Sequence, residues 1–137
     1  VEDNAVVILK NDANQLAVLH SSATFWRHMF QFDIILEQGY LKLEGLLSKT
    51  GSYGRETLII GRRQFEDETE AVGKPSEEII YFDKDLSWEL EVNQFVDCIM
   101  NDKPILESNS KDAYDAMDLV HKCYQDSDFP IYQTEAS

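Results

Sequence analysis

The chain has 137 residues, a size typical of one domain that can bury a core without a disulfide or a metal. Its 12 Lys and Arg residues against 26 Asp and Glu residues give a formal net charge of −14, which argues against binding to nucleic acid or to an anionic membrane. No apolar run approaches the ~20 residues that span a bilayer, and no signal peptide opens the sequence, so we expect a soluble, cytoplasmic protein.

The first half of the sequence predicts strands joined by turns. The apolar segments 5–9 and 16–20 flank 11–14, whose Asn and Asp residues favour a turn and tolerate left-handed backbone. Val1 is not an initiator Met and stands only a few residues before the first apolar segment. We therefore interpret residues 1–137 as a single-domain fragment of a longer protein, cut at Val1.

A longer strand is predicted from Trp26 to Leu36, because apolar and polar residues alternate there with a period of two. Further strands are predicted at 40–44, Thr57–Gly61 and Ile79–Phe82, and the Gly- and Ser-bearing stretch 48–54 is expected to turn. The acidic segment 66–75 is expected to form a surface loop. One face of the Trp26–Leu36 strand is apolar, with His28, Phe30, Phe32, Ile34 and Leu36, and the other is mixed, with Arg27, Met29, Gln31, Asp33 and Ile35.

The last third of the sequence changes to a helical period. A first helix is expected to start at a cap formed by Asp85 or Ser87 and to end near Met100 or Asn101, before Pro104. A second helix is expected to follow a cap at Ser110. The expected apolar stripes are Trp88, Val92, Phe95, Val96 and Ile99 on the first helix and Ala113, Ala116, Met117, Val120, Cys123 and Tyr124 on the second.

These elements predict an α+β fold with two layers. We expect an open sheet of about six strands, largely antiparallel or mixed, with the two C-terminal helices packed on one face. Cys98 and Cys123 are expected to be reduced, mostly buried thiols, and a disulfide between the paired helices is the alternative.

Motifs for catalysis are missing from the sequence. It contains neither a GxGxxG nor a P-loop pattern, and no Ser lies in a nucleophile elbow. His20, His28 and His121 make no metal-ligand spacing with the cysteines, and the many carboxylates leave no particular pair to select. We therefore expect no catalytic, metal-binding or cofactor-binding residue in this chain.

The order of several segments resembles the C-terminal domain of the Gfo/Idh/MocA family. Glu2-Asp3-Asn4-Ala5 opens a strand, and residues 32–41 resemble the family's strand, glycine turn and strand. Residues 91–99, Pro104 and Asp112-Ala113 resemble its helical tail. The resemblance covers nearly the whole chain.

Members of this family are NAD(P)-dependent oxidoreductases that act on sugars, inositols and nucleotide sugars. In the family a Rossmann domain binds NAD or NADP and carries a catalytic lysine, and the next helix carries an Asp/His-x-x-x-His proton-transfer pair. Neither is present in this chain. The resemblance therefore implies a domain that contributes substrate contacts and an oligomer interface beside its own Rossmann domain, and that is inactive alone.

The resemblance also indicates substrate-binding residues. The loop that enters the long strand brings aromatic and polar side chains to the substrate in this family, and Trp26, Arg27 and His28 occupy that place. Trp26 is suited to stack on a sugar face, and Arg27 or His28 to bind a hydroxyl, phosphate or carboxylate. Tyr53, in its glycine turn, is a further candidate. The alternative is that Trp26 packs at the sheet rim and Arg27 is solvated.

Two interpretations of function follow. In the first, the chain belongs to an oxidoreductase, contacts a small carbohydrate-like substrate and forms a homo-oligomer through the open face of its sheet. In the second, it is a non-enzymatic module that uses the same sheet to bind a ligand or a partner protein.

Overall fold

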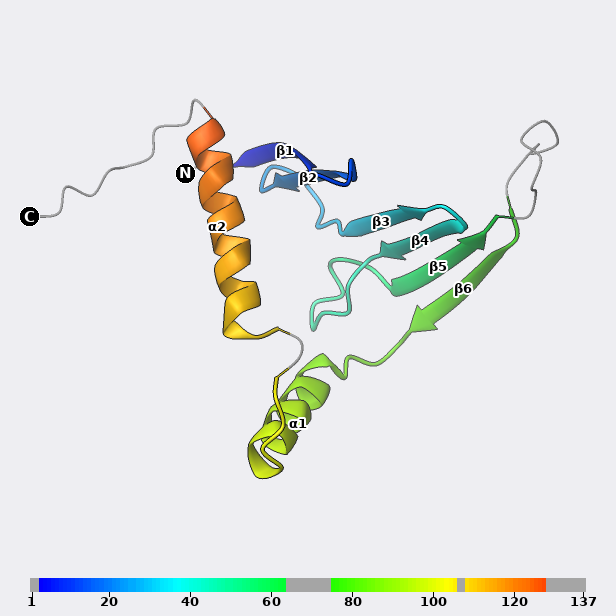
Figure 1. The fold of residues 1–137 in the computed structure, drawn as a ribbon. Helices are drawn as coiled ribbons and strands as arrows, with labels where there is room; N and C mark the ends of the chain where they lie inside the picture. The colour runs from blue at the N-terminus through cyan, green and yellow to red at the C-terminus, as the bar shows by residue number, and fades with distance from the viewer. Residues whose placement is uncertain (1–2, 64–74, 106–107, 128–137) are drawn as a thin grey trace, which may run out of the picture. The chain divides into compact units, whose positions relative to one another are not determined.

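The computed structural model describes residues 3–63, 75–105 and 108–127. These residues form six strands and two helices, which confirms the predicted α+β class (Figure 1). The predicted acidic loop, 66–75, lies outside the described residues except for Pro75. The elements are β1 (Asn4–Lys10), β2 (Leu16–Ser22), β3 (Gln31–Leu36), β4 (Gly39–Glu44), β5 (Glu56–Arg62), β6 (Glu77–Phe82), α1 (Ser87–Met100) and α2 (Ser110–Asp126).

The described strands form two sheets where the sequence predicted one. β1 pairs with β2, and the other four strands form a sheet in the order β3-β4-β5-β6. The chain divides into two compact units, one of Val1–Ser21 with Glu89–Ser137 and one of Ser22–Trp88. The packing of the two helices on one face of a sheet stays a prediction.

The turn between β1 and β2 forms where the asparagines predict it. Asn14 adopts a left-handed backbone with φ of 61°. The amide N of Asn11 donates to the carbonyl O of Gln15 at 3.2 Å, and the Asn11 side chain accepts from the Gln15 amide at 3.0 Å. Side chains of the turn therefore replace part of the backbone pairing that ends there.

The four-stranded sheet is antiparallel throughout and has one apolar face. Because directly paired residues point to the same side, the register places Phe32, Leu43, Leu58 and Ile80 in one row across the four strands. This confirms that Phe32, Ile34 and Leu36 share a face, which we call the apolar face. The mixed face carries Gln31, Asp33, Ile35, Tyr40, Lys42, Glu44, Thr57, Ile59, Gly61, Glu77, Ile79 and Tyr81.

On the mixed face, Tyr40 connects strands that are not neighbours. Its hydroxyl, from β4, donates to Glu77 Oε1 of β6 at 2.6 Å. The intervening residue on β5 is Gly61, and a Cβ added there would lie 2.3 Å from the Tyr40 ring. Only glycine leaves room for the ring to cross β5, so Gly61 allows a hydrogen bond that ties three strands together.

β3 is shorter than predicted, because it begins at Gln31 and residues 26–30 form no strand. The prediction of a strand from Trp26 was wrong, and the reason lies in the partner strand. β4 ends at Glu44, which pairs with Gln31, and Gly45 then turns the chain away with φ of +74°. Without a neighbouring strand, alternation alone does not keep residues 26–30 in the sheet.

α1 begins and ends close to the predicted residues. Asp85 accepts from the hydroxyl and the amide of Ser87, which lowers the pKa of the Asp85 carboxyl. At the other end Asp102 takes a φ of 49°, and the Lys103 amide donates to the Cys98 carbonyl at 2.9 Å, as in a Schellman motif. Lys103 also donates to Asp97 at 2.8 Å, and this bond lowers the pKa of Asp97.

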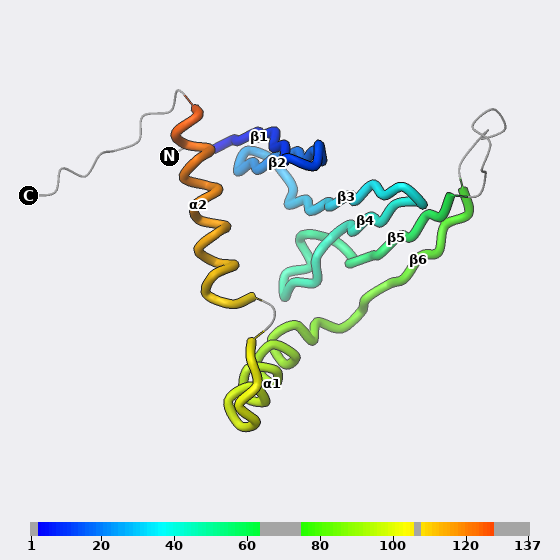
Figure 2. The backbone as a smooth tube through the Cα atoms, viewed as in Figure 1, coloured from blue at the N-terminus to red at the C-terminus, as the bar shows by residue number. Residues whose placement is uncertain are grey.

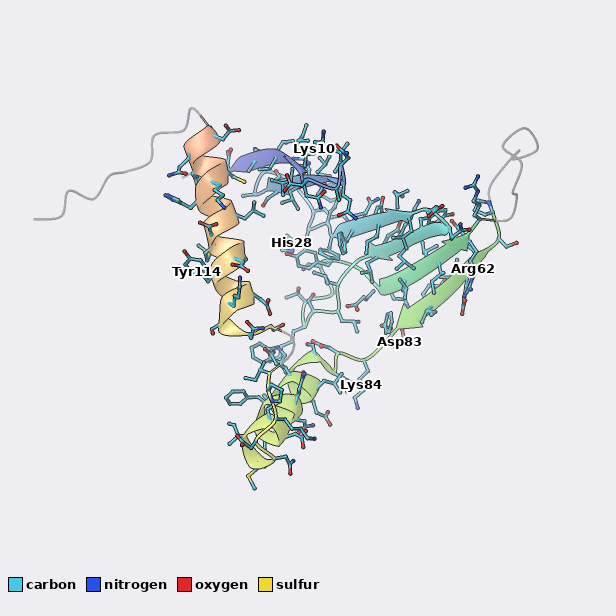
Figure 3. The ribbon with its side chains drawn as sticks, viewed as in Figure 1. Lys10, His28, Arg62, Asp83, Lys84 and Tyr114 are labelled. Atoms are coloured by element: carbon cyan, nitrogen blue, oxygen red, sulfur yellow. The ribbon has the colours of Figure 1, made fainter. Side chains whose placement is uncertain are left out.

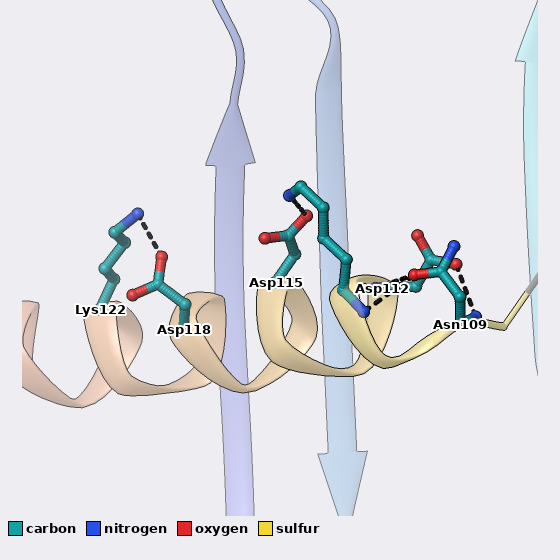
Figure 4. A network of polar contacts seen from close by, with 6 residues as sticks. Asn109, Asp112, Asp115, Asp118 and Lys122 are labelled. Carbon is teal, nitrogen blue, oxygen red and sulfur yellow. Dashed lines mark hydrogen bonds and ion pairs between the residues drawn. The ribbon is translucent and has the colours of Figure 1, made fainter.

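α2 is capped one residue earlier than predicted. Asn109, not Ser110, is the cap, because its side chain accepts from the amides of Lys111 and Asp112 while Asp112 accepts from the Asn109 amide (Figure 4). This reciprocal pair is a capping box. Two ion pairs at i,i+4 spacing, Lys111–Asp115 and Asp118–Lys122, follow along the helix and raise the pKa of both lysines.

Both cysteines are free, in agreement with the first of the two expectations. Cys98, at 9% exposure, is the buried hydrophobic residue among the side chains that the structure describes, and Cys123 is half-buried. Of the helices in the described ranges, none combines the length and the apolar character required to cross a bilayer.

The capping box of α2 predicts the effect of two neighbouring substitutions. Asn109→Ala removes the acceptor of two helix amides and should lower the free energy of unfolding by about 1 kcal/mol. Ser110→Ala, the matched control, should change it by less than about 0.5 kcal/mol. Urea unfolding followed by circular dichroism measures both. A larger loss for Ser110→Ala than for Asn109→Ala would contradict the assignment of the cap.

Candidate functional site

The predicted site residues lie in two loops at one end of the four-stranded sheet. In an antiparallel sheet of this order, β3 and β5 begin at the end where β4 and β6 finish. The loop before β3, 23–30, and the loop between β4 and β5, 45–55, therefore share that end (Figure 2). A backbone hydrogen bond from the Gly45 amide to the Phe30 carbonyl, 3.0 Å long, joins the two loops at their base.

His28, which is labelled in Figure 3, contacts Tyr53, although the two residues are 25 positions apart in the sequence. Their rings stack with centroids 4.9 Å apart and an interplanar angle of 24°. His28 Nδ1 also lies 2.8 Å from the hydroxyl of Ser52. Two of the four predicted residues thus form one cluster, and the contacts orient the imidazole with its Nε2 away from Ser52.

The cluster continues into a line of hydroxyls that the sequence analysis missed. Thr50 Oγ1 lies 2.8 Å from Ser52 Oγ and 3.4 Å from Ser48 Oγ, so Ser48, Thr50 and Ser52 lead in hydrogen-bonded steps to His28. The signal in the sequence was the presence of hydroxyl residues at every second position, Ser48, Thr50 and Ser52. The sequence predicted a turn at 48–54, and a turn alone did not indicate that these hydroxyl groups form hydrogen bonds with one another.

Trp26 and Arg27 are exposed beside this cluster. The Trp26 side chain is 94% exposed, so it does not pack at the sheet rim. Arg27 is also exposed, and it takes part in no ion pair with the described residues. The structure therefore brings His28 and Tyr53 into contact, whereas Trp26 and Arg27 share only the loop of His28.

Three contacts hold the second loop in place. Leu47 donates its amide to Glu56 Oε2 at 3.0 Å, at the start of β5. Arg55 makes a bidentate pair with Asp83, with hydrogen bonds of 2.8 and 2.9 Å. The Arg55 guanidinium also lies 4.2 Å from the centroid of the Tyr81 ring. The loop is thus anchored by groups of β5, β6 and the chain just after β6.

His28 and Ser52 are as close as a catalytic base and its nucleophile. The other groups that such a catalytic site needs are not present among the described residues. No described carboxylate contacts the His28 ring, and the Ser52 hydroxyl is shared with Thr50. A base oriented by a third group is what activates a serine. This arrangement instead presents a ring nitrogen, hydroxyls and an aromatic face, which are groups that bind polar ligands.

Other candidate sites in the described part of the chain are weaker. No group of three or more His, Cys, Asp or Glu side chains within these ranges is arranged to hold a metal ion. The described residues also form a hollow of about 300 Å³ at the opposite end of the sheet. It is lined by Leu36, Glu37, Gly39, Tyr40, Arg62, Arg63 and Pro75, and none of the predicted site residues is among them.

Comparisons with models of protein families, with curated proteins and with solved structures give no match to this chain. The resemblance to the Gfo/Idh/MocA family stays a prediction from the sequence.

The stacked pair predicts a proton NMR signature. The Tyr53 ring current should move the imidazole signals of His28 upfield, and Tyr53→Leu should return them downfield. Ser52→Ala should shift them as well, because it removes the contact at Nδ1. His20 and His121, which belong to the other compact unit, provide internal controls. Unchanged His28 signals in both variants would contradict the cluster.

Proposed function

We propose that this chain is the substrate-side domain of an NAD(P)-dependent oxidoreductase that acts on a sugar, an inositol or a nucleotide sugar. The observation that supports this proposal is the pairing of His28 with Tyr53 beside the exposed Trp26, at the entrance to β3. The family that the sequence resembles carries its substrate contacts at this entrance. The two free thiols fit a reducing cytoplasm.

In this proposal each residue has a physical role. Trp26 offers a flat apolar surface that covers one face of a sugar ring, and its exposure leaves that surface accessible. His28 Nε2 forms a hydrogen bond with a ligand hydroxyl. Tyr53 and Ser52 are positioning residues, because they hold the imidazole at its ring face and at Nδ1. Arg27 binds a second polar group of the ligand.

The nicotinamide cofactor is assigned to a Rossmann domain of the same protein. NAD or NADP would accept or donate the hydride there. The residues described in this chain do not fit that cofactor, since no Gly-rich loop among them leads from a strand into a helix. The function proposed for this chain is therefore substrate binding, and we expect it to be inactive alone.

Two tryptophans provide a direct test of the ligand site. In a ¹⁵N-labelled sample, millimolar myo-inositol or glucose should shift the indole signal of Trp26, and Trp88 should serve as the internal control. His28→Ala should weaken this response several-fold, because it removes the hydrogen bond to the ligand. NADH should leave both indole signals unchanged. Equal shifts of both indoles, or none with any sugar, would contradict the proposed site.

A second candidate function is an interaction module that associates through the same sheet. Exposed apolar side chains on the mixed face favour it, with Ile35 at 76%, Tyr81 at 52% and Ile79 at 46% exposure. Association of two copies through this face would remove these side chains from water. The same contact would serve a homo-oligomeric enzyme, so the two candidate functions differ in ligand binding and agree on association.

Sedimentation equilibrium tests the association. We expect a dimer or higher oligomer, and Ile35→Lys should weaken it at least tenfold by placing a charge in the interface. Ile8→Lys is the matched control, because Ile8 is 73% exposed and lies on β1 in the other unit. A 15.8 kDa monomer at high concentration would contradict association. Equal effects of both variants would contradict the assigned face.

A further inference from the structure

The two loops of the candidate site contain no acidic residue, although the chain has 26. The sequence has no Asp or Glu between Asp12 and Asp33, and none between Glu44 and Glu56. The same two stretches carry Arg27, Lys49 and Arg55 together with His28. In a chain with a net charge of −14, two acid-free stretches with cations make a local reversal of charge.

The fold brings these two stretches together. The Gly45 amide and the Phe30 carbonyl join them at their base, and His28 contacts Ser52 and Tyr53 nearer to their tips. A positive region on one loop is therefore not cancelled by acids on the other. The acids at this end of the sheet lie outside the two loops, at Glu44 and Glu56 and at Asp83 and Asp85 after β6.

Two of the cations remain available for a ligand. Arg55 is paired with Asp83, and its charge is therefore compensated. Arg27 and Lys49 are exposed and form no ion pair with any described residue. Of the acids that flank the second loop, Glu56 accepts from the Leu47 amide, and Glu44 is exposed at the end of β4.

Neutral donors complete the set of groups. The hydroxyls of Ser48, Thr50 and Ser52 follow one another on the same loop as Lys49, and they end at His28. Hydroxyls, an imidazole N–H and exposed Lys and Arg side chains are the donors that proteins use for phosphate and carboxylate groups. Arg gives a bidentate contact, and Lys a point charge.

We propose that this two-loop cluster binds the anionic group of a small ligand, a phosphate monoester or a carboxylate. Arg27 and Lys49 contact the anion, and the ring of the ligand lies toward Trp26. The inference rests on the proposed function for the ring of the ligand and goes beyond it for the charged group. It narrows the substrate class to phosphorylated or acidic carbohydrates.

Calorimetry with four probes tests this proposal: glucose, glucose 6-phosphate, glucuronate and inorganic phosphate. Glucose 6-phosphate, glucuronate or both should bind at least tenfold more tightly than glucose at low ionic strength, and added salt should weaken this binding. A preference for the phosphate ester or for the acid decides which anion the site takes. Inorganic phosphate should bind weakly, because it lacks the ring.

Matched substitutions locate the site. Arg27→Gln and Lys49→Gln should each weaken binding of the charged probe by about fivefold. Lys49→Gln should leave the binding of glucose little changed, because Lys49 has a role only toward the anion. Arg62→Gln is the control, because it removes the same charge at the opposite end of the same sheet (Figure 3). These side chains are exposed, so circular dichroism should show an unchanged fold for each variant.

Three outcomes would overturn the inference. If glucose binds as tightly as the charged probes, the site has no preference for an anion, and the proposed carbohydrate function stands. If Arg62→Gln weakens binding as much as Arg27→Gln, the attraction is a general effect of charge. Failure of all four probes would overturn both this inference and the proposed function.

Discussion

The candidate site depends on the backbone at Gly45. This residue is buried, has φ of +74°, and leaves no room for a side chain, since a Cβ would lie 2.4 Å from the Arg55 carbonyl O and 3.1 Å from that of Tyr53. Its amide bonds to Phe30. One glycine therefore ends β4, ends the pairing of β3, and packs the two loops together. A substitution at Gly45 would separate His28 from Tyr53 without touching either residue.

The sheet explains why this end of the molecule can hold such a cluster. Tyr40 crosses Gly61 to reach Glu77, so β4, β5 and β6 are tied by a side-chain hydrogen bond in addition to their ladders. Near the other end, Arg55 joins the start of β5 to Asp83, just beyond β6, and stacks on Tyr81. The loops thus extend from strands whose spacing is fixed at both ends, which limits how far the loop residues can move apart.

The elements that the sequence predicted well are those that local patterns determine. Alternation located β4, the segments predicted as strands at 57–61 and 79–82 lie in β5 and β6, and the asparagine turn between β1 and β2 formed as expected. The predictions were wrong where the structure of a segment depends on its contacts with other parts of the chain. Residues 26–30 alternate like a strand, but β4 ends before Gly45 and therefore provides no strand for them to pair with. Asn109, and not Ser110, caps α2, because the Asp112 side chain accepts a hydrogen bond from the Asn109 amide. The division into two sheets likewise depends on pairing between strands, which periodicity does not encode.

The candidate site, like the fold, could be predicted from the sequence only in part. His28 and Tyr53 were chosen separately, and only the fold shows that their rings touch. The lack of acidic residues within the two loops was visible in the sequence, but it becomes informative only because the fold joins the two loops. A loop that avoids negative charge in a chain of net charge −14 gains nothing in solubility, because the rest of the surface already supplies it. The composition of the two loops is therefore better explained by a ligand that they bind than by the requirements of folding. This supports the proposal that the ligand carries an anionic group.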